Sequence, residues 1–448
     1  MGSDTWLHLP AVARRAAWLL AGGLLVRRTA EVMAARRCAR WSRSRLSSVP
    51  AHAGPPWDRL VCIVPMYHEQ EIAEEAVAFW NSVAGVTPVD EVLFVTTARE
   101  DAEGSRSTHA LLAKALEQAD PDRSRLRLLH CASADRFRAA QLNMAVSDVR
   151  KRLHRGATAS RVWVGVYNAD SRPQASTFAE LHHQACAEAG TRIYQQLVDY
   201  VLPDRLGVSW VAAGNSVLQT WWTQSHYWAR NRRASAALHW WASTSPFSTF
   251  GHGEFIRLDL LDELGGFPGF AYADGLLLGW ICRLMDERIG LLATRDRAEV
   301  PRNARDLLTQ QRAWMQGLLN FGTTVRWART RGRISLAGPE VALLRCQHLA
   351  IPLAWGLSTP AVMAGMTVAA GRFRHGEGTL TDAACLLALA SYPVIPVLAS
   401  SRRHGADETP PCEVAAAAAS WMVEGLAFWP ALMSHFRSGQ TAPAKTPR

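Results

Sequence analysis

Short apolar runs and polar, helix-forming stretches alternate along the central part of the chain, between residues 58 and 329. Four of the apolar runs have the length and composition of buried β-strands: residues 60–66, 92–96, 126–130 and 162–167. Helices are predicted over residues 69–82 and 107–119, which lie between them. Strands and helices that alternate at this spacing indicate an α/β fold, with a doubly wound, mostly parallel sheet and flanking helices.

Three long apolar stretches follow this central part, over residues 349–371, 383–400 and 414–432. The first two contain no charged residue, and the third contains only Glu424. A helix needs about 20 mostly apolar residues to cross a membrane, so residues 340–436 are predicted to hold two or three transmembrane helices, followed by a flexible tail over 437–448. The alternative is three buried helices of a large soluble domain. A carboxyl group is costly in lipid, so Glu424 is expected to face protein or water.

The N-terminal 50 residues combine one apolar run, residues 16–26, with many arginines on both sides of it. The run is shorter than the roughly 20 residues of an ordinary span. The pattern therefore predicts a basic amphipathic helix that lies on an anionic membrane surface, with a short span as the alternative. A Pro/Gly-rich linker over residues 51–56 separates it from the central domain, residues 58–329.

Composition narrows the function classes. The 448 residues carry a net charge of +10, with 48% hydrophobic residues, 20% charged residues and 18 Trp, which is too apolar for a disordered chain. The eight cysteines form no CxxC pair, so a zinc ribbon or a disulfide framework is not indicated and a reducing, cytosolic environment fits the central domain. A basic chain suits nucleic acid, anionic lipid or a phosphorylated substrate, and the predicted membrane helices argue against nucleic acid.

Chemically suggestive residues follow the predicted strands. The first strand continues into PMYHEQE, in which Glu69 or Glu71 can cap a helix or contact a ligand. Arg138 begins the predicted helix RAAQLNMAVSDV, whose positive end suits a phosphate group. The fourth strand ends in Asn168 and Asp170, within NADSRP, which reads either as cation-binding oxygens or as a simple Asx-turn. Two further segments are GHGEFIRLDLLDELGGFPGFAYADG and TQQRAWMQG.

Together these segments resemble the family 2 glycosyltransferases, the membrane-attached GT-A enzymes related to cellulose, chitin and hyaluronan synthases. The resemblance covers residues 58–329 and the apolar stretches after them. It implies a Rossmann-like GT-A fold and inverting transfer of a sugar from a nucleotide-sugar donor to an acceptor hydroxyl, on a lipid-linked or polysaccharide acceptor, with magnesium or manganese as cofactor. It also implies a multi-pass protein of the cell membrane with a cytosolic catalytic domain.

The resemblance assigns roles to individual positions. Asp274 matches the general base that deprotonates the acceptor hydroxyl, and Asp170 matches the metal ligand. The donor and its phosphates would be bound by Glu69, Arg138, Asn168 and Asp170, and the acceptor by Gln310, Arg312 and Trp314. Gly265 and Gly266 would form a turn that lets the backbone approach the sugar.

The sequence departs from the family pattern at several of these positions. Asn168 replaces an Asp, Ala273 replaces a Glu beside the base, and Ala313 replaces the Arg of the QxxRW motif. Arg312 precedes that last position by one residue, and on a helix it points about 100° away from it. Thr96 and Thr97 end the second strand where the family often has acidic residues that hold the nucleotide base, so the nucleotide is not identified. These departures keep a second hypothesis open, a non-catalytic membrane protein with a degenerate glycosyltransferase fold.

A nicotinamide-dependent oxidoreductase is a third hypothesis, and the missing GxGxxG after the first strand argues against it. One more segment, residues 210–241, is rich in aromatic and basic residues, namely Trp221, Trp222, Trp228, Trp240, Arg230, Arg232 and Arg233. It is expected either to receive a lipid-linked or glycan acceptor or to form an aromatic belt resting on lipid.

Overall fold

The computed structural model describes most of the chain: residues 5–47, 57–120, 124–133, 135, 137–153, 158–203, 207–235, 246–271, 273–401 and 411–438. The linker predicted over 51–56, Trp240 and residues 439–448 of the predicted tail lie outside these described residues.

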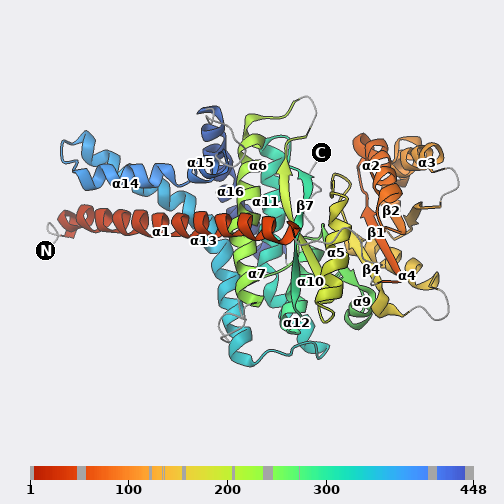
Figure 1. The fold of residues 1–448 in the computed structure, drawn as a ribbon. Helices are drawn as coiled ribbons and strands as arrows, with labels where there is room; N and C mark the ends of the chain where they lie inside the picture. The colour runs from red at the N-terminus through yellow and green to blue at the C-terminus, as the bar shows by residue number, and fades with distance from the viewer. Residues whose placement is uncertain are drawn as a thin grey trace.

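The centre of the molecule is a seven-stranded sheet with the order β3-β2-β1-β4-β6-β5-β7 (Figure 1). Its strands are β1 Arg59–Pro65, β2 Glu91–Thr97, β3 Leu126–Cys131, β4 Val162–Val166, β5 Ile193–Val201, β6 Glu254–Arg257 and β7 Ile289–Glu299. Only β6 among these strands runs antiparallel, and it pairs with β4 and β5. The mostly parallel α/β sheet predicted from the sequence is therefore confirmed, and β1 to β4 match the four predicted strands.

Helices cover both faces of the sheet, and this explains why its strands are continuous apolar runs rather than alternating ones. In β1, Val61 and Ile63 belong to one buried cluster, which includes side chains of α4 (Arg138–Lys151), α9 (Leu258–Leu264) and α10 (Asp274–Leu284). Cys62 and Val64 belong to the other cluster, with α2 (Ala73–Val86), α3 (Thr108–Ala119) and α5 (Ser176–Ala187). Short turns of helix, η1 Gln70–Ile72, η2 Ala98–Arg106 and η3 Ala159–Arg161, complete these connections.

The N-terminal region is one helix, α1 (Thr5–Ser47), much longer than its apolar run. In Figure 1 it extends from the N-terminal tip, beside α14, into the centre of the molecule. Ala17, Ala21 and Leu24 pack in a cluster with residues of the C-terminal helices, whereas Cys38 belongs to the core beneath the sheet. Part of the apolar run is thus engaged in helix packing while the rest is exposed, and α1 joins the C-terminal helices to the central domain.

A second group of helices packs between the sheet and the C-terminal region. It comprises α6 Trp210–Trp222, η4 Thr223–Tyr227, α7 Trp228–Ser235, α11 Ala304–Leu319 and α12 Phe321–Thr330. A side chain at Gly214 of α6 would overlap the backbone of Ala416 in α16, so these two helices meet at their backbones. Small residues permit this close approach, which fixes α16 against the domain.

The C-terminal helices differ in part from the prediction. The first apolar stretch lies in α13 (Gly338–Arg374), which is long and apolar enough to cross a membrane, and it alone passes that test within the described residues. The second is not one helix, because it divides into α14 (Leu380–Ser391) and α15 (Ile395–Ser401) around Pro393, which removes a helical N–H. The third lies in α16 (Pro411–Ser438) and packs against α6 and α11. A multi-pass protein is therefore not supported.

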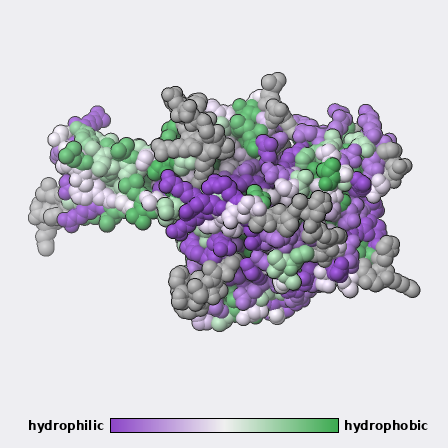
Figure 2. Space-filling view, in the orientation of Figure 1, coloured by the Kyte–Doolittle hydropathy of each residue, from purple (hydrophilic) through white to green (hydrophobic). Residues whose placement is uncertain are grey.

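Large hydrophobic side chains are exposed mainly on these outlying helices. They include Leu19 and Val26 on α1, Leu357 on α13, Leu387 on α14 and Phe436 on α16. The space-filling view shows apolar surface on the projection that α1 and α14 form (Figure 2). An exposed apolar surface of this kind marks a contact with a membrane or another protein.

Candidate active site

A cavity of about 1220 Å³ opens where β1 and β4 end and continues between α6, α11, α13 and α16. The carboxyl ends of parallel strands are the usual ligand-binding edge of such a sheet. The cavity is lined by almost every site residue predicted from the sequence, namely Glu69, Arg138, Asn168, Asp170, Asp274, Gln310 and Trp314. Arg312 differs, because it is exposed on the far side of α11 and is not part of the lining.

Arg138 contacts several other residues of the site. As the first residue of α4, it is placed at the positive end of that helix. Its guanidinium donates to Asn168 Oδ1 at 2.9 Å, to the carbonyl oxygen of Gly251 at 2.6 Å and to Asp274 Oδ2 at 2.8 Å. One cation therefore connects the turn after β4 with the start of α10.

Asp274 is held at the start of α10 by a compact backbone arrangement. Ala273, before it, has a left-handed backbone with φ of 69°, which a non-glycine residue adopts only when its surroundings impose it. A side chain at Gly275 would overlap the backbone of Gly251, and the Thr249 hydroxyl donates to the Gly275 carbonyl at 2.6 Å. The carboxylate is thus fixed against the loop over residues 247–253.

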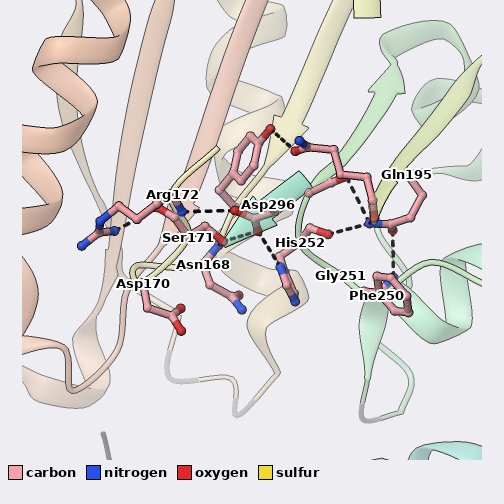
Figure 3. A network of polar contacts seen from close by, with 12 residues as sticks. Asn168, Asp170, Ser171, Arg172, Gln195, Phe250, Gly251, His252 and Asp296 are labelled. Carbon is pink, nitrogen blue, oxygen red and sulfur yellow. Dashed lines mark hydrogen bonds and ion pairs between the residues drawn. The ribbon is translucent and has the colours of Figure 1, made fainter. Parts of the chain in front are cut away.

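That loop is itself held by polar groups of the sheet (Figure 3). Gln195 of β5 accepts from the Phe250 N–H at 2.9 Å and donates to the His252 carbonyl at 2.8 Å. Asp296 of β7 is fully buried, lies 2.9 Å from His252 Nδ1 and accepts from the Ser171 hydroxyl at 2.7 Å. Buried polar groups that satisfy one another in this way give a rigid frame.

His252 lines the cavity and was not identified from the sequence. The buried partner that orients its ring, Asp296, is 44 residues further along the chain, so no local pattern connects the two. The only sequence signal was the position of His252 inside the GHGEF segment.

Asp170 and Asn168 follow β4, as the sequence predicted, but they are differently engaged. One oxygen of Asp170 accepts from the Glu299 N–H at 3.0 Å, and its side chain is almost fully buried while lining the cavity. The Asn168 amide oxygen is bonded to Arg138. Within the described residues no three His, Cys, Asp or Glu side chains form a metal-binding group. A cation held by Asp170 would therefore take most of its ligands from a diphosphate and water.

Glu254 on β6 is a fully buried carboxyl group behind Asp274. Burial, with the charge of Asp274 as a second cause, raises the pKa of Glu254 to about 7. A carboxyl group with this pKa is partly protonated at neutral pH. Burial rather than local sequence sets this pKa, so no sequence pattern predicted it.

Aromatic and basic side chains line the part of the cavity beyond β1. Tyr67, His68 and Arg99 contribute there, with the Arg99 guanidinium 3.9 Å from the centre of the Tyr67 ring. His68 has φ of 52°, and its N–H donates to Glu100 at 2.7 Å, which holds this turn. Flat rings and a guanidinium suit stacking on a nucleobase.

Thr96 and Thr97, at the end of β2, do not line the cavity. The Thr96 hydroxyl instead lies 2.9 Å from His109 Nδ1 and 3.0 Å from His130 Nδ1. The end of β2 therefore contacts neighbouring side chains of the protein and not the cavity.

The glycines of the GGF segment have another role than the one expected. Gly265 ends α9 in the left-handed conformation, and Gly266, with φ of 100°, lies against the Asn143 amide. Asn143 accepts from the Phe267 N–H at 2.7 Å and donates to its carbonyl at 2.9 Å. Neither glycine lines the cavity. The prediction that they approach a sugar is wrong, because the turn is locked onto α4.

On α11, the cavity is lined by Gln310, Gln311 and Trp314. Gln310 accepts from Gln219 Nε2 at 3.1 Å. Gln311 is fully buried, and neither polar atom of its side chain has a hydrogen-bond partner in the described part of the chain. An unsatisfied buried amide costs about 1–3 kcal/mol, so Gln311, which sequence reasoning missed, is a candidate for ligand contact.

The aromatic and basic segment predicted after residue 210 divides between two environments. Trp221, Trp222 and Arg230 line the cavity, whereas Trp228 is buried beneath the sheet and outside its lining. Arg232 and Arg233 are exposed. Part of this segment thus faces the interior, where a ligand can reach it.

Comparisons with known proteins agree with this geometry at the level of the fold. No protein-family model and no curated protein sequence matches the chain. The mannosyltransferase PcManGT from Pyrobaculum calidifontis, solved with GDP-Man and Mn²⁺, is 17% identical and has a TM-score of 0.50 over 95% of this chain and 100% of that chain. This likeness shows that the chain shares the fold of a glycosyltransferase.

Two more distant structures were also found. TarS from S. aureus is 11% identical, with a TM-score of 0.35 over 82% of this chain and 55% of that chain. A mycobacterial protein is 15% identical, with a TM-score of 0.33 over 60% of this chain and 75% of that chain.

Proposed function

We propose that this protein is a membrane-attached glycosyltransferase of the family 2 type, with a GT-A domain, which transfers a sugar from a nucleotide-sugar donor to an acceptor hydroxyl with inversion. The observation that carries the proposal is the meeting of Arg138, Asn168, Asp170 and Asp274 in one cavity at the carboxyl ends of β1 and β4. A base, a phosphate-binding cation and a cation-binding carboxylate are the groups this reaction needs.

The donor binds along the strand ends. Tyr67 and Arg99 hold the nucleobase, and Arg138, at the positive end of α4, holds the diphosphate. Glu69, buried at the turn after β1 and lining the cavity, contacts the nucleoside. Asp170 is the carboxylate that would hold magnesium or manganese together with the diphosphate, where the cation neutralises charge on the leaving group.

Asp274 acts as the general base. The acceptor oxygen attacks the anomeric carbon, and the bond from that carbon to the diphosphate oxygen breaks with its electron pair on the diphosphate. The hydroxyl proton moves to the Asp274 carboxylate, while Arg138 stabilises the negative charge that develops on the departing diphosphate. Attack from the face opposite the leaving group inverts the anomeric carbon.

The acceptor enters from the side of α11 and α13. Gln310, Gln311 and Trp314 line that part of the cavity and supply polar contacts and a stacking face. The apolar helix α13 and the exposed apolar surface on α1 and α14 attach the protein to the membrane, with the catalytic domain on the cytosolic side. Lipid-linked and glycan acceptors both suit this position.

The direct test follows nucleoside diphosphate release in membranes that contain the protein, with a panel of donors that includes GDP-mannose, with magnesium or manganese, and with a membrane lipid extract as acceptor. Asp274→Asn is expected to lower the rate of release by about 10²–10⁴-fold. Asp262→Asn is a matched control, because Asp262 is an exposed carboxylate on α9 whose surface ion pair with Arg150 contributes little to stability.

Release that depends on the cation and falls this far only in Asp274→Asn would support the transferase. If no donor gives release, or if Asp274→Asn is as active as Asp262→Asn, the proposal is wrong. The degenerate, non-catalytic membrane protein is then the better description.

A further inference from the structure

The cavity continues past the acceptor helix α11 into an inner part lined by α1, α6, α7, α13 and α16. Three arginines line this inner part, namely Arg27, Arg28 and Arg230. Two carboxyl groups, Glu31 and Glu424, lie beside these arginines, and only Glu424 lines the cavity itself.

Both carboxylate oxygens of Glu31 already have hydrogen-bond and ion-pair partners. It lies 2.8 Å from Arg27 Nε, 2.9 Å from His226 Nε2, and also forms an ion pair with Arg28. Trp221 Nε1 donates to it at 3.4 Å. Burial by itself raises the pKa of Glu31, but His226, Arg28 and Arg27 together bring it below its ordinary value. Glu31 is therefore ionised, and it organises the cluster without neutralising all of it.

Arg230 is the arginine of this cluster that Glu31 does not pair with. It forms no hydrogen bond or ion pair with the residues that the structure describes, although it lines the cavity. Burial, followed by the charges of Arg233 and Arg27, lowers the pKa of Arg230 to about 10. The guanidinium is thus protonated at neutral pH and has donors available for an anion.

The walls around these cations are apolar. Leu218, Ile351, Trp355 and Trp421 contribute to the lining, and α13, which supplies two of them, is the helix able to cross a membrane. A site with guanidinium groups in apolar walls matches a molecule with one anionic group on a hydrocarbon chain.

We propose that this inner part of the cavity binds the phosphate of a lipid, through Arg230, Arg27 and Arg28, with its hydrocarbon chain against α13 and α16. Resting on the proposed function, the inference further identifies that lipid as the acceptor: a lipid-linked sugar whose phosphate is held here while its sugar hydroxyl reaches Asp274 in the same cavity. Inorganic phosphate alone would lack the apolar contacts, and an uncharged lipid would lack the ionic ones.

The experiment measures binding to the full chain in nonionic detergent by native mass spectrometry. The probes are hexadecyl phosphate, hexadecanol and inorganic phosphate. Hexadecyl phosphate is expected to bind at least ten times more tightly than either of the others. Arg230→Gln is expected to weaken its binding at least tenfold, and Arg230→Lys is expected to restore a large part of it, because the charge is retained.

Arg232→Gln is the matched control, since it removes the same charge from the same helix at an exposed position. It is expected to leave hexadecyl phosphate binding within twofold of the unchanged protein. Thermal unfolding of each variant identifies any that fails to fold, and Arg27→Gln then provides a second test of the cluster.

The inference is overturned if Arg230→Gln and Arg232→Gln bind hexadecyl phosphate equally well, or if hexadecanol or inorganic phosphate binds as tightly. Failure of the proposed function gives a different result. Asp274→Asn is expected to bind hexadecyl phosphate normally, so lipid binding without sugar transfer from any donor would overturn the acceptor role and leave the phosphate site in place.

Discussion

Arg138 holds Asp274, with guanidinium Nη2 at 2.8 Å and Nε at 3.2 Å from the carboxylate Oδ2. While this contact is made, two N–H groups of Arg138 occupy the Asp274 oxygen Oδ2. The same guanidinium is the group best placed for the donor diphosphate. A diphosphate bound to Arg138 would compete with Asp274 for its donors, so donor binding and release of the base are coupled in this geometry.

This coupling predicts that substitutions of Arg138 and Asp274 lower activity non-additively. Asp274→Asn is expected to lower kcat by about 10²–10⁴-fold, as removal of a general base does, with little change in the donor KM. Arg138→Gln is expected to raise the donor KM and to lower kcat. The double variant is expected to be about as slow as Asp274→Asn, because the two residues act as one unit. Steady-state release of nucleoside diphosphate measures all four proteins. Losses that multiply would contradict the coupling.

Asn168 gives a prediction about the cation. Asn168→Asp keeps the oxygen that accepts from Arg138 Nη1 and adds a negative charge next to Asp170. Divalent cations prefer charged oxygens, so the variant is expected to bind Mn²⁺ more tightly, as measured directly by electron paramagnetic resonance with a nucleoside diphosphate present. A chelator is expected to stop transfer by the unchanged protein. Unchanged or weaker Mn²⁺ binding in Asn168→Asp would argue that the turn after β4 holds no cation.

Much of the fold could be predicted from the sequence, because local signals and tertiary packing agree there. The apolar runs of β1, β2 and β4 are buried on both faces, so their composition alone identified them. The edge strand β3 is half-buried and still carries a short apolar run. The antiparallel β6 was not predicted, since its four residues begin with Glu254 and end with Arg257 and so form no apolar run. A helix in the N-terminal 50 residues was predicted and matches α1, but its packing was not, because its polar half packs against the domain through small residues such as Ala35.

The site was predictable where a residue begins a helix or follows a strand, as Arg138, Asp170 and Asp274 do. It was not predictable where residues distant in sequence meet. His252 and Asp296 pair across 44 positions. Arg230 lies near enough to Arg27 for their charges to interact only because α1 packs against α7. The GGF turn was misinterpreted for the same reason, since its partner Asn143 is 124 residues away.

Gly275 predicts how strictly Asp274 must be placed. Gly275→Ala puts a methyl group into the backbone of Gly251, so α10 or the loop over 247–253 must shift and move the carboxylate. Misplacement by about 1 Å can cost about 100-fold in rate, and kcat is expected to fall by about that factor. Gly322→Ala on α12 meets only the end of Arg345 and is the control, expected to keep full activity. Equal activities would show that the close approach does not position Asp274.

Gln311 predicts a conflict between stability and activity. Gln311→Met fills a similar volume and removes a buried amide that has no hydrogen-bond partner in the described residues. The variant is expected to be more stable by about 1–3 kcal/mol, seen as a higher thermal midpoint, and to have a higher acceptor KM. The neighbouring Gln310→Met breaks the bond with Gln219 and is expected to bring no gain in stability. A less stable Gln311→Met would mean that the amide is satisfied in solution.

Glu254 predicts how stability depends on pH. Its folded pKa of about 7 exceeds the ordinary value of 4.5. The stability that protonated Glu254 contributes is therefore complete below pH 4.5 and is lost as the pH rises through 7. Each pKa unit is worth about 1.4 kcal/mol. The Gln side chain of Glu254→Gln stays neutral. Its free energy of unfolding, relative to that of the unchanged protein, is therefore expected to rise by on the order of 2 kcal/mol between pH 5 and pH 8.

Thermal midpoints of both proteins at pH 5 and pH 8 measure this difference. Glu74→Gln, an exposed position on α2, is the control and is expected to follow the pH dependence of the unchanged protein. If Glu254→Gln and Glu74→Gln show the same pH dependence, Glu254 does not titrate near neutrality. If the thermal midpoint of Glu254→Gln changes less between pH 5 and pH 8 than those of the other two proteins, ionisation of Glu254 is what destabilises the folded protein as the pH rises.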